Sequence, residues 1–189
     1  MLKKLERPNE LIDITQFEFG KRYNSEFNES DEGFLFLDKE TESSDDIVIR
    51  LIDNRAYWDV ADSYIENAPL YGRPFIHGLF DCYTFFRDLY KREFDIDIID
   101  AEYEDAWWNN GKNHYVENVN AAGFSLIEPP LQKGDLVAMR VMSPVINHVA
   151  VYMGDGQVAH HLGGCDSVLE KFRPAYLAME SGFYRHESM

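Results

Sequence analysis

Apolar positions in the first third of the chain predict short strands and one helix. Residues 33–37 and 47–52 are runs of strand-forming side chains, and we expect them to form two strands around an acidic turn. Residues 56–67 instead carry apolar side chains at helical spacing, with Trp58 and Ile65 on the same side. This third stretch is therefore expected to be a helix.

The strongest helical pattern runs from Asp81 to Phe94. Asp81 is a residue type that caps helix N-termini, because its carboxylate accepts hydrogen bonds from the free N–H groups of the first turn. The apolar positions follow the alternating three- and four-residue spacing of one buried face. The members of that face are Cys82, Phe85, Phe86, Leu89 and Tyr90. The Cys82 thiol is therefore expected in the first turn, directed toward the core. A second helical region is expected from Asp105 to about Asn120.

The last third of the chain has the pattern of an antiparallel sheet. Segments 136–142, 148–153 and 157–162 are rich in apolar, strand-forming side chains. Gly154-Asp155-Gly156 is a strong turn signal between the last two segments. A helix followed by consecutive antiparallel strands is the order of an α+β protein, which is the fold class that we predict.

The length of this turn determines which of two histidines lies beside His148. If the loop has three residues, Ala150 lies opposite His160, whose side chain is then diagonally next to His148 on the same face. If the loop has two residues, the pairing slips by one position and His161 takes that face. The residues alone leave both registers open.

The composition of the chain gives it a large negative charge. The 189 residues are 45% hydrophobic, as in folded proteins, and the formal net charge is −16. Such a charge argues against nucleic acid or an anionic membrane surface as a partner. The sequence has no long apolar run and no basic-then-apolar N-terminal segment. We therefore expect no membrane insertion, no export signal and synthesis in a cytoplasm.

Composition also changes near residue 70. All six histidines lie at or after His77, whereas the preceding part is acidic, which excludes a histidine-ligated zinc site there. We therefore divide the chain into a small acidic N-terminal region of unknown role, 1–69, and a second domain, 70–189. No cofactor or metal is expected. Cys82 and Cys165 are too few for a disulfide framework, although a single bridge between them is an alternative.

Cys82 and His148 are candidates for nucleophilic catalysis. A helix N-terminus favours negative charge, so a cysteine in a first turn can have a lowered pKa and attack a carbonyl as its thiolate. His148 would take the thiol proton and later protonate the leaving amine, while a second histidine fixes its tautomer. Backbone N–H groups at the helix start would stabilise the oxyanion. The simpler interpretation is an inert buried cysteine and a hydrogen-bonded core histidine.

Longer motifs resemble the NlpC-type peptidases, papain-like cysteine enzymes that cut peptide bonds in bacterial cell walls. The resemblance covers roughly residues 71–186 and rests on the segments GRPFIHGLFDCYTFFRDLY, DAWWNNGKNHYVENVNAAGF and KGDLVAMRVMSPVINHVAVYMGDGQVAHHL. It implies a papain-like fold, with an antiparallel sheet packed on helices and the nucleophile at a helix N-terminus. It also implies Cys82 as nucleophile, His148 as base and, twelve positions later, His160 as the third catalytic residue.

The residues after Cys82 indicate which members of the family the chain resembles most. Tyr83-Thr84 stands where many NlpC-type enzymes have Ser-Gly, and it is the pattern of the phage-tail members. The resemblance therefore implies a phage or prophage tail-associated cysteine peptidase, made in the host bacterial cytoplasm and acting at the virion tail tip. Its expected partners are other phage tail-tip proteins and the peptidoglycan stem peptide, cut at an amide bond of the D-glutamyl–diaminopimelate type. The alternatives are a structural tail-tip assembly factor with a silent triad, and an amide hydrolase or acyltransferase on a non-wall substrate.

Five further side chains are expected to bind the substrate. Trp107 and Trp108 can form a groove wall, because aromatic rings stack well on flat or apolar groups, or they can fill the core. Asp81 can orient a substrate amine as well as cap the helix, and Tyr83 can gate the cleft. The family has an upstream tyrosine that lines the oxyanion site, and Tyr71 is its nearest match.

Overall fold

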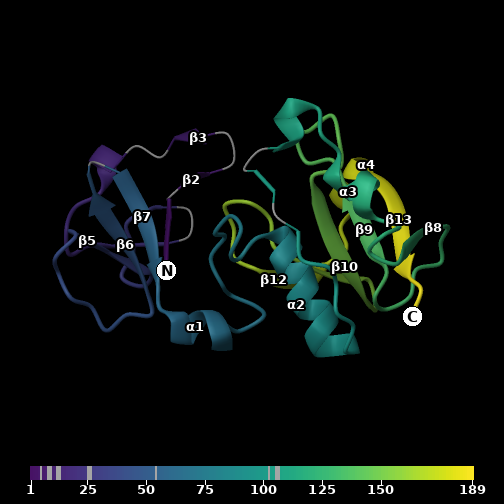
Figure 1. Cartoon of the computed structure of the whole chain (residues 1–189), viewed down its shortest axis with the longest axis horizontal. Helices are drawn as coiled ribbons and strands as arrows, with labels where there is room; N and C mark the ends of the chain where they lie inside the picture. The colour runs from purple at the N-terminus through teal and green to yellow at the C-terminus, as the bar shows by residue number, and fades with distance from the viewer. Residues whose placement is uncertain are drawn as a thin grey trace.

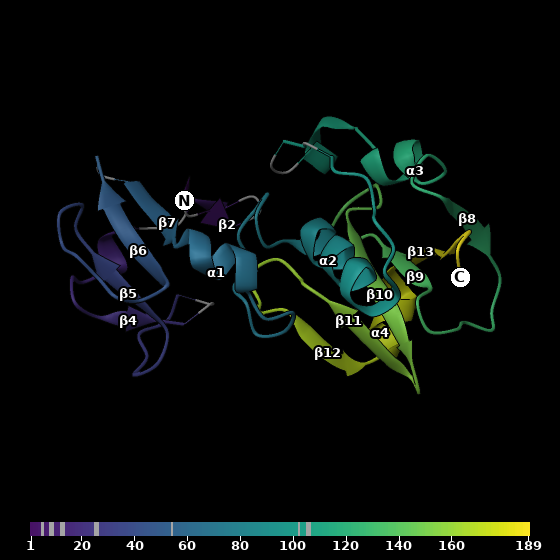
Figure 2. The same cartoon turned by 60° about the horizontal axis from the view of Figure 1, so that its bottom comes forward.

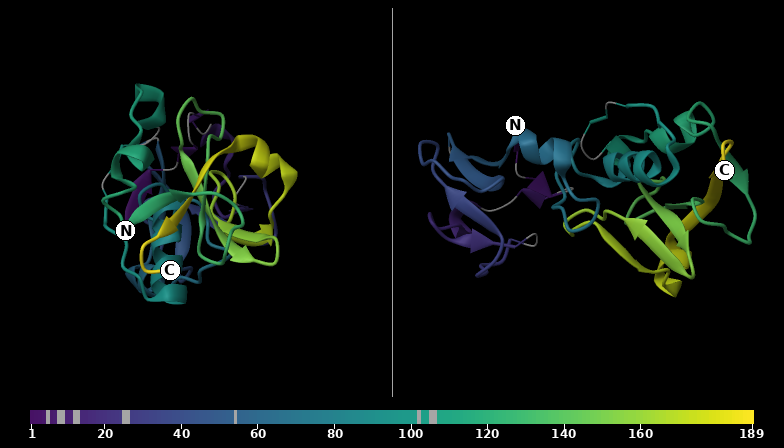
Figure 3. Two further views of the ribbon diagram at one scale, coloured as in Figure 1. Left: turned by 90° about the vertical axis from the view of Figure 1, so that its right-hand side faces the viewer. Right: turned by 90° about the horizontal axis from the view of Figure 1, so that it is seen from below.

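Two β-sheets lie next to each other along the long axis of the molecule (Figures 1 and 3). The structure, a computed structural model, describes the chain apart from residues 5, 8, 9, 12, 13, 25, 26, 54, 102, 105 and 106. For the other residues between 4 and 13 it describes the backbone only. One sheet is built from the N-terminal part of the chain and the other from the C-terminal part, and the α+β class is confirmed.

The first sheet has five strands in the order β1-β7-β6-β5-β4. Its strands are β1 (Leu2–Lys4), β4 (Arg22–Tyr23), β5 (Phe34–Leu37), β6 (Ile47–Ile52) and β7 (Arg55–Val60). Nearby are the strand pair β2 (Glu6–Arg7) and β3 (Glu10–Leu11) and the 3-10 helix η1 (Ile14–Gln16). The strands predicted at 33–37 and 47–52 are confirmed, but they pair in parallel and so are not the arms of a hairpin.

The helix predicted at 56–67 is wrong in its first half. Residues 56–60 belong to β7, where Ala56, Trp58 and Val60 are buried and the residues between them are more exposed. This two-residue alternation is that of a strand, and β7 pairs with β6 along its whole length. Only α1 (Asp62–Asn67) is helical, because packing of Trp58 in the sheet outweighs the helical spacing of the segment.

The second sheet has six antiparallel strands in the order β12-β11-β10-β9-β13-β8. Its strands are β8 (Phe124–Ile127), β9 (Leu136–Met139), β10 (His148–Gly154), β11 (Gln157–His160), β12 (Val168–Lys171) and β13 (Glu180–His186). Helix α4 (Pro174–Met179) connects β12 to β13. The three predicted strands are confirmed, although β9 and β11 end earlier than expected, at Met139 and His160.

Helix α2 (Cys82–Phe94) covers one face of this sheet, and α4 lies on the opposite face (Figure 2). The predicted apolar face of α2 is confirmed, since its four aromatic and leucine side chains are buried. They share a core with Val149 and Val151 of β10, whereas Ala150 belongs to the core on the α4 side. His148 shares a face with Ala150, because side chains alternate along a strand.

The core of the first sheet reaches the segment that leads into α2. That core contains Phe36, Ile49 and Trp58, and it also includes Ile76 and Phe80, just ahead of the helix. The start of α2 is therefore held from two sides, by the first core before the helix and by the second core along it.

The helix predicted from Asp105 to Asn120 is also shorter than expected. Residues 105 and 106 lie outside the described residues. The described remainder forms the 3-10 helix η2 (Trp107–Asn110) and the helix α3 (His114–Asn118). Between them lies Gly111 with a φ of +74°, a conformation that glycine adopts readily and other residues rarely do.

Candidate active site

Asp81 fixes the start of α2. Its Oδ1 accepts hydrogen bonds from the N–H groups of Tyr83 (3.1 Å) and Thr84 (3.0 Å), and Thr84 Oγ1 accepts one from the Asp81 N–H (2.8 Å). Its Oδ2 accepts from the Gly78 N–H (2.7 Å) and the Tyr103 hydroxyl (2.8 Å). This capping box confirms the predicted N-cap. Both carboxylate oxygens accept hydrogen bonds from the chain's own donors, and Asp81 also lines the cavity described below. Its contact with a substrate amine stays a prediction.

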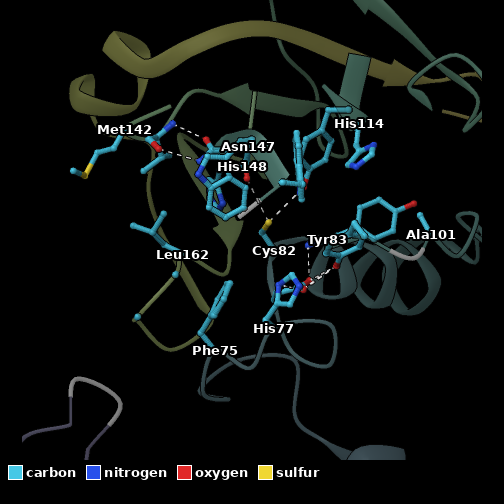
Figure 4. Close-up of a pocket in the computed structure, with 18 of the residues that line it drawn as sticks. Phe75, His77, Cys82, Tyr83, Ala101, His114, Met142, Asn147, His148 and Leu162 are labelled. Atoms are coloured by element: carbon cyan, nitrogen blue, oxygen red, sulfur yellow. Dashed lines mark hydrogen bonds and ion pairs between the residues drawn. The ribbon is translucent and has the colours of Figure 1, made fainter. Parts of the chain in front are cut away.

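The Cys82 sulfur lies at the first residue of α2, in the wall of a cavity of about 560 Å³ (Figure 4). Sγ is 3.4 Å from the Tyr115 hydroxyl and 3.9 Å from the carbonyl oxygen of Asn147, the residue before β10. Cys82 and Cys165, both described, are not joined by a disulfide.

The pKa of the Cys82 thiol is raised, not lowered. Although the residue as a whole is partly accessible, burial of the sulfur, followed by the negative charge of Asp81, raises the pKa from 9.0 to about 12. A helix N-terminus contributes at most about 2 kcal/mol, which lowers a pKa by roughly 1.5. The lowered pKa expected from the helix start is therefore wrong for Cys82, because desolvation of the sulfur and the charge of the capping carboxylate outweigh the helix dipole.

His148, the first residue of β10, lines the same cavity as Cys82. Its Nε2 lies 3.0 Å from Nδ1 of His160, so Nδ1 of His148 is the ring nitrogen that this contact does not use. Burial, together with the neighbouring rings of His160 and His161, holds the pKa of His148 well below its ordinary value. The ring is therefore a neutral base at pH 7.

A bulge sets the register of the β10–β11 hairpin. Gly154 pairs with Gln157, so the turn between them has two residues. An irregularity between Tyr152 and Gly154 adds one residue to β10, and beyond it Val151 pairs with Ala159. The bulge thus restores the pairing that a three-residue loop would have given. We expected a two-residue loop to place His161 on the face of His148, and this expectation is wrong.

This register brings His160, and not His161, to the face of His148. The two rings of His148 and His160 have their centroids 5.3 Å apart. His161 lies on the other face, where its ring centroid is 5.2 Å from that of Phe75 and 6.2 Å from that of Phe85. Of the two candidates left open by the sequence, the structure therefore pairs His160 with His148.

Glu170 of β12 was not predicted from the sequence, and it lies next to His160. Its Oε1 is 3.0 Å from His160 Nε2 and also accepts a hydrogen bond from the Tyr176 hydroxyl, while its Oε2 pairs with Arg173. Only the antiparallel pairing of β11 with β12 brings this carboxylate to the histidine. The mixed polar and apolar residues 168–171 gave no strand signal that would have revealed it.

Comparisons with known proteins identify the family of the chain. Residues 72–179, more than half of the chain, match the model of the NlpC/P60 family. The chain belongs to the NlpC/P60 family. The tail tip assembly protein K of Escherichia phage lambda is 39% identical over 122 residues, which cover 63% of this chain and 60% of that protein. The protein of the same name from Escherichia phage N15 is 33% identical over 98 residues, covering 51% and 40%.

This NlpC/P60 chain spans less than two thirds of the length of these curated relatives. Among solved structures, an NlpC/P60 family protein from Bacillus cereus ATCC 10987 has a TM-score of 0.43 at 20% sequence identity, over 77% of this chain and 52% of that one.

Aromatic side chains from η2 and α3 form one wall of the cavity. Trp107, Trp108, His114 and Tyr115 all line it. Trp107 is only 4% exposed, and its ring centroid is 4.8 Å from that of His114 and 6.0 Å from that of Tyr115. Trp107 thus both fills the core and faces the cavity. His114 and Tyr115 were not singled out from the sequence, because a continuous helix was expected there.

The two remaining tyrosines differ in their positions. Tyr83 lines the cavity, but its hydroxyl donates a hydrogen bond to the Ile99 carbonyl oxygen at 2.7 Å. Tyr71 is 37% exposed, packs with its ring centroid 6.1 Å from that of Phe85, and is not among the described residues that line the cavity. The structure therefore does not bring Tyr71 to the cavity, and the tyrosine beside the Cys82 sulfur is Tyr115.

The described part of the chain contains no group of three or more His, Cys, Asp or Glu side chains arranged to hold a metal ion. None of its helices combines the length and the apolar character that crossing a bilayer requires.

Proposed function

We propose that this NlpC/P60 chain is a phage or prophage tail-associated cysteine peptidase that hydrolyses amide bonds in peptidoglycan stem peptides. The observation that carries the proposal is the His148–His160 contact of 3.0 Å in a chain whose Cys82 lines the same cavity as His148. A cysteine, a base and a group that orients the base are the parts that nucleophilic acyl transfer requires. The tail-tip names of the phage relatives support a place at the virion tail tip, among other tail-tip proteins.

The proposed reaction begins with the neutral pair. Cys82 Sγ attacks the carbonyl carbon of the scissile amide while His148 Nδ1 takes the thiol proton. Because the thiol is protonated and the imidazole is neutral, proton transfer accompanies the attack and does not precede it. When the tetrahedral intermediate collapses, His148 gives this proton to the leaving amine. Water, deprotonated by His148, then hydrolyses the thioester and releases the Cys82 thiol.

Two donors beside the sulfur can stabilise the oxyanion. The Tyr115 hydroxyl is 3.4 Å from Sγ, and burial, followed by the neighbouring Cys82, raises the pKa of Tyr115 well above its ordinary value, so it stays a donor. The second donor is the N–H of Cys82, because Asp81 accepts the N–H groups of the next two residues. Fixed donors of this kind act on the charge that develops in the transition state.

Digestion of purified peptidoglycan tests the proposal. We expect wild type and the control Cys165→Ala to release new amino groups and peptide fragments, and Cys82→Ala to release none. Cys165 is exposed and absent from the cavity wall, so its substitution controls for loss of a thiol as such. Mass spectrometry of the fragments identifies the bond, which we propose to be of the D-glutamyl–diaminopimelate type. Equal release by wild type and Cys82→Ala would contradict the enzymatic proposal.

A second function, in tail-tip assembly without catalysis, is favoured by the relatives' names and by the protonated thiol. In this function residues 1–69 would dock to another tail protein. Deleting them would disturb the site, because Phe80 packs in the first core. Charge reversal at exposed Glu40 and Glu42 is the better test, alongside Cys82→Ala, in complementation of tail assembly. Normal tails with Cys82→Ala and failed tails after charge reversal support this assembly role.

A further inference from the structure

Glu170 ends a row of contacts that begins at the cavity. His148 contacts His160, and His160 contacts Glu170, each through nitrogen or oxygen atoms 3.0 Å apart. His160 is 2% exposed, and the Glu170 side chain is 19% exposed. Of the three, only His148 is among the described residues that line the cavity. A substrate in the cavity can therefore touch His148, while Glu170 acts only through the histidines.

Glu170 is held as a carboxylate. Its Oε1 accepts from the Tyr176 hydroxyl and its Oε2 pairs with Arg173. Partial burial raises the pKa of Glu170, but hydrogen bonds from Tyr176 and His160, together with the charge of Arg173, lower it, and the pKa lies below its ordinary value. An ionised carboxylate accepts hydrogen bonds and cannot donate one.

This one-way hydrogen bonding fixes the proton positions on both rings. His160 must carry its proton on Nε2 to donate to Glu170, which in the neutral ring makes its Nδ1 an acceptor. His148 must then carry its proton on Nε2 and donate to that Nδ1. The Nδ1 of His148 is left with a lone pair, and this is the form that can take the Cys82 proton.

We propose that Glu170 is a positioning residue that selects the catalytically competent tautomer of His148 through His160. Without the carboxylate, the distance between the rings would equally permit the opposite direction of the hydrogen bond between them, which we call the reversed order. In that order His160 donates from Nδ1, and His148 carries its proton on Nδ1, where it cannot accept one from the thiol. The reversed order also sets the bare Nε2 of His160 against an oxygen of Glu170 that has only lone pairs to offer, and this repulsion excludes it.

The variant Glu170→Gln tests this selection with little change in size. Its amide NH₂ can donate to His160 Nε2, so both proton orders become available. We expect kcat on peptidoglycan to fall roughly tenfold or more, as for other groups that orient a functional histidine. KM is expected to stay unchanged, because Glu170 does not line the cavity. Glu128→Gln, the same substitution at an exposed residue outside the cavity wall, is the matched control.

The proton positions are measured directly by ¹⁵N NMR of the histidine-labelled full chain, in which protonated and bare ring nitrogens have well-separated shifts. Wild type and Glu128→Gln are expected to carry the proton on Nε2 of both His148 and His160. Glu170→Gln is expected to add a population of His148 protonated on Nδ1. A wild-type His148 protonated on Nδ1, or ring shifts unchanged in Glu170→Gln, would overturn the inference.

The kinetic arm of this test rests on the proposed function, but the NMR arm does not. If wild type has the expected tautomers and releases no wall peptides, the proposed function fails and the role of Glu170 stands. If wild type cleaves the wall and Glu170→Gln keeps both its tautomers and its kcat, the role of Glu170 fails and the proposed function stands. A merely structural role would lower the thermal midpoint of Glu170→Gln and leave the ring nitrogens of His148 as in wild type.

Discussion

The rate at which iodoacetamide alkylates Cys82, measured as a function of pH, tests whether the thiol is protonated. The experiment uses a Cys165→Ser chain, in which Cys82 is the remaining thiol. Alkylation requires the thiolate, so its rate follows the ionised fraction. Because burial and then the charge of Asp81 raise the pKa of Cys82 to about 12, we expect a rate that rises tenfold per pH unit, without levelling, from about pH 6 to 9.

The size of the effect follows from the same pKa. With a pKa of about 12, roughly one Cys82 in 10⁵ is ionised at pH 7, against roughly 3% of ordinary thiols with a pKa near 8.5. A thiolate of higher pKa is the better nucleophile. With a Brønsted coefficient of about 0.4–0.5, the difference between the two pKa values makes the Cys82 thiolate react roughly 30-fold faster than an ordinary thiolate. Alkylation of Cys82 at pH 7 is therefore expected to be roughly 100-fold slower than that of an ordinary thiol.

The reference is the Cys82→Ala chain, in which the exposed Cys165 reacts. Its alkylation rate gives the reactivity of an exposed thiol in the same chain, with which the rate of Cys82 is compared. A rate for Cys82 that is already level below pH 7 would refute the reasoning. It would mean that the helix dipole and His148 outweigh desolvation, so that a thiolate–imidazolium pair exists before substrate binds.

Three further outcomes are expected. Tyr115→Phe removes a donor from beside the sulfur and should lower kcat roughly 100-fold in the wall-digestion assay, with KM little changed. His160→Ala removes the partner of His148 Nε2 and should lower kcat roughly 100-fold or more, whereas His161→Phe, on the other face, should retain turnover. Burial, followed by the charge of Arg73, lowers the pKa of His161 to about 3, so the unfolded chain binds more protons between about pH 6.5 and 3. The contribution of His161 to the free energy of unfolding should therefore fall by roughly 2 kcal/mol from pH 7 to 5. Urea unfolding at both pH values measures this contribution as the difference between wild type and His161→Phe.

Local patterns predicted the elements that carry the nucleophile and the base. The capping residue Asp81 and the buried face of α2 follow from side-chain chemistry and from a period of about 3.6 residues. The strand that begins at His148 follows from a run of apolar, β-branched residues bounded by a glycine turn. These features depend on neighbours in sequence, and the chain alone contains the information for them.

Features that depend on contacts between residues far apart in the sequence could not be predicted from local patterns. Trp58 has helical spacing relative to its neighbours, but its ring packs in the core of the first sheet and the segment becomes a strand. The bulge after Tyr152 leaves no mark in the turn sequence, and it reverses the consequence expected for a two-residue loop. Glu170 reaches His160 through the pairing of β12, a strand with no clear apolar pattern.

Capping and periodicity are local, and they were enough to predict that Cys82 stands at a helix start and His148 at a strand start. The electrostatics of the site depend instead on contacts that form only when the chain folds. The thiol lies under Tyr115 and beside the charge of Asp81, and the imidazole is buried against His160, so the pair is neutral although a helix start favours a thiolate. Desolvation is a property of the surroundings that folding brings together, and no spacing along the chain can encode it directly.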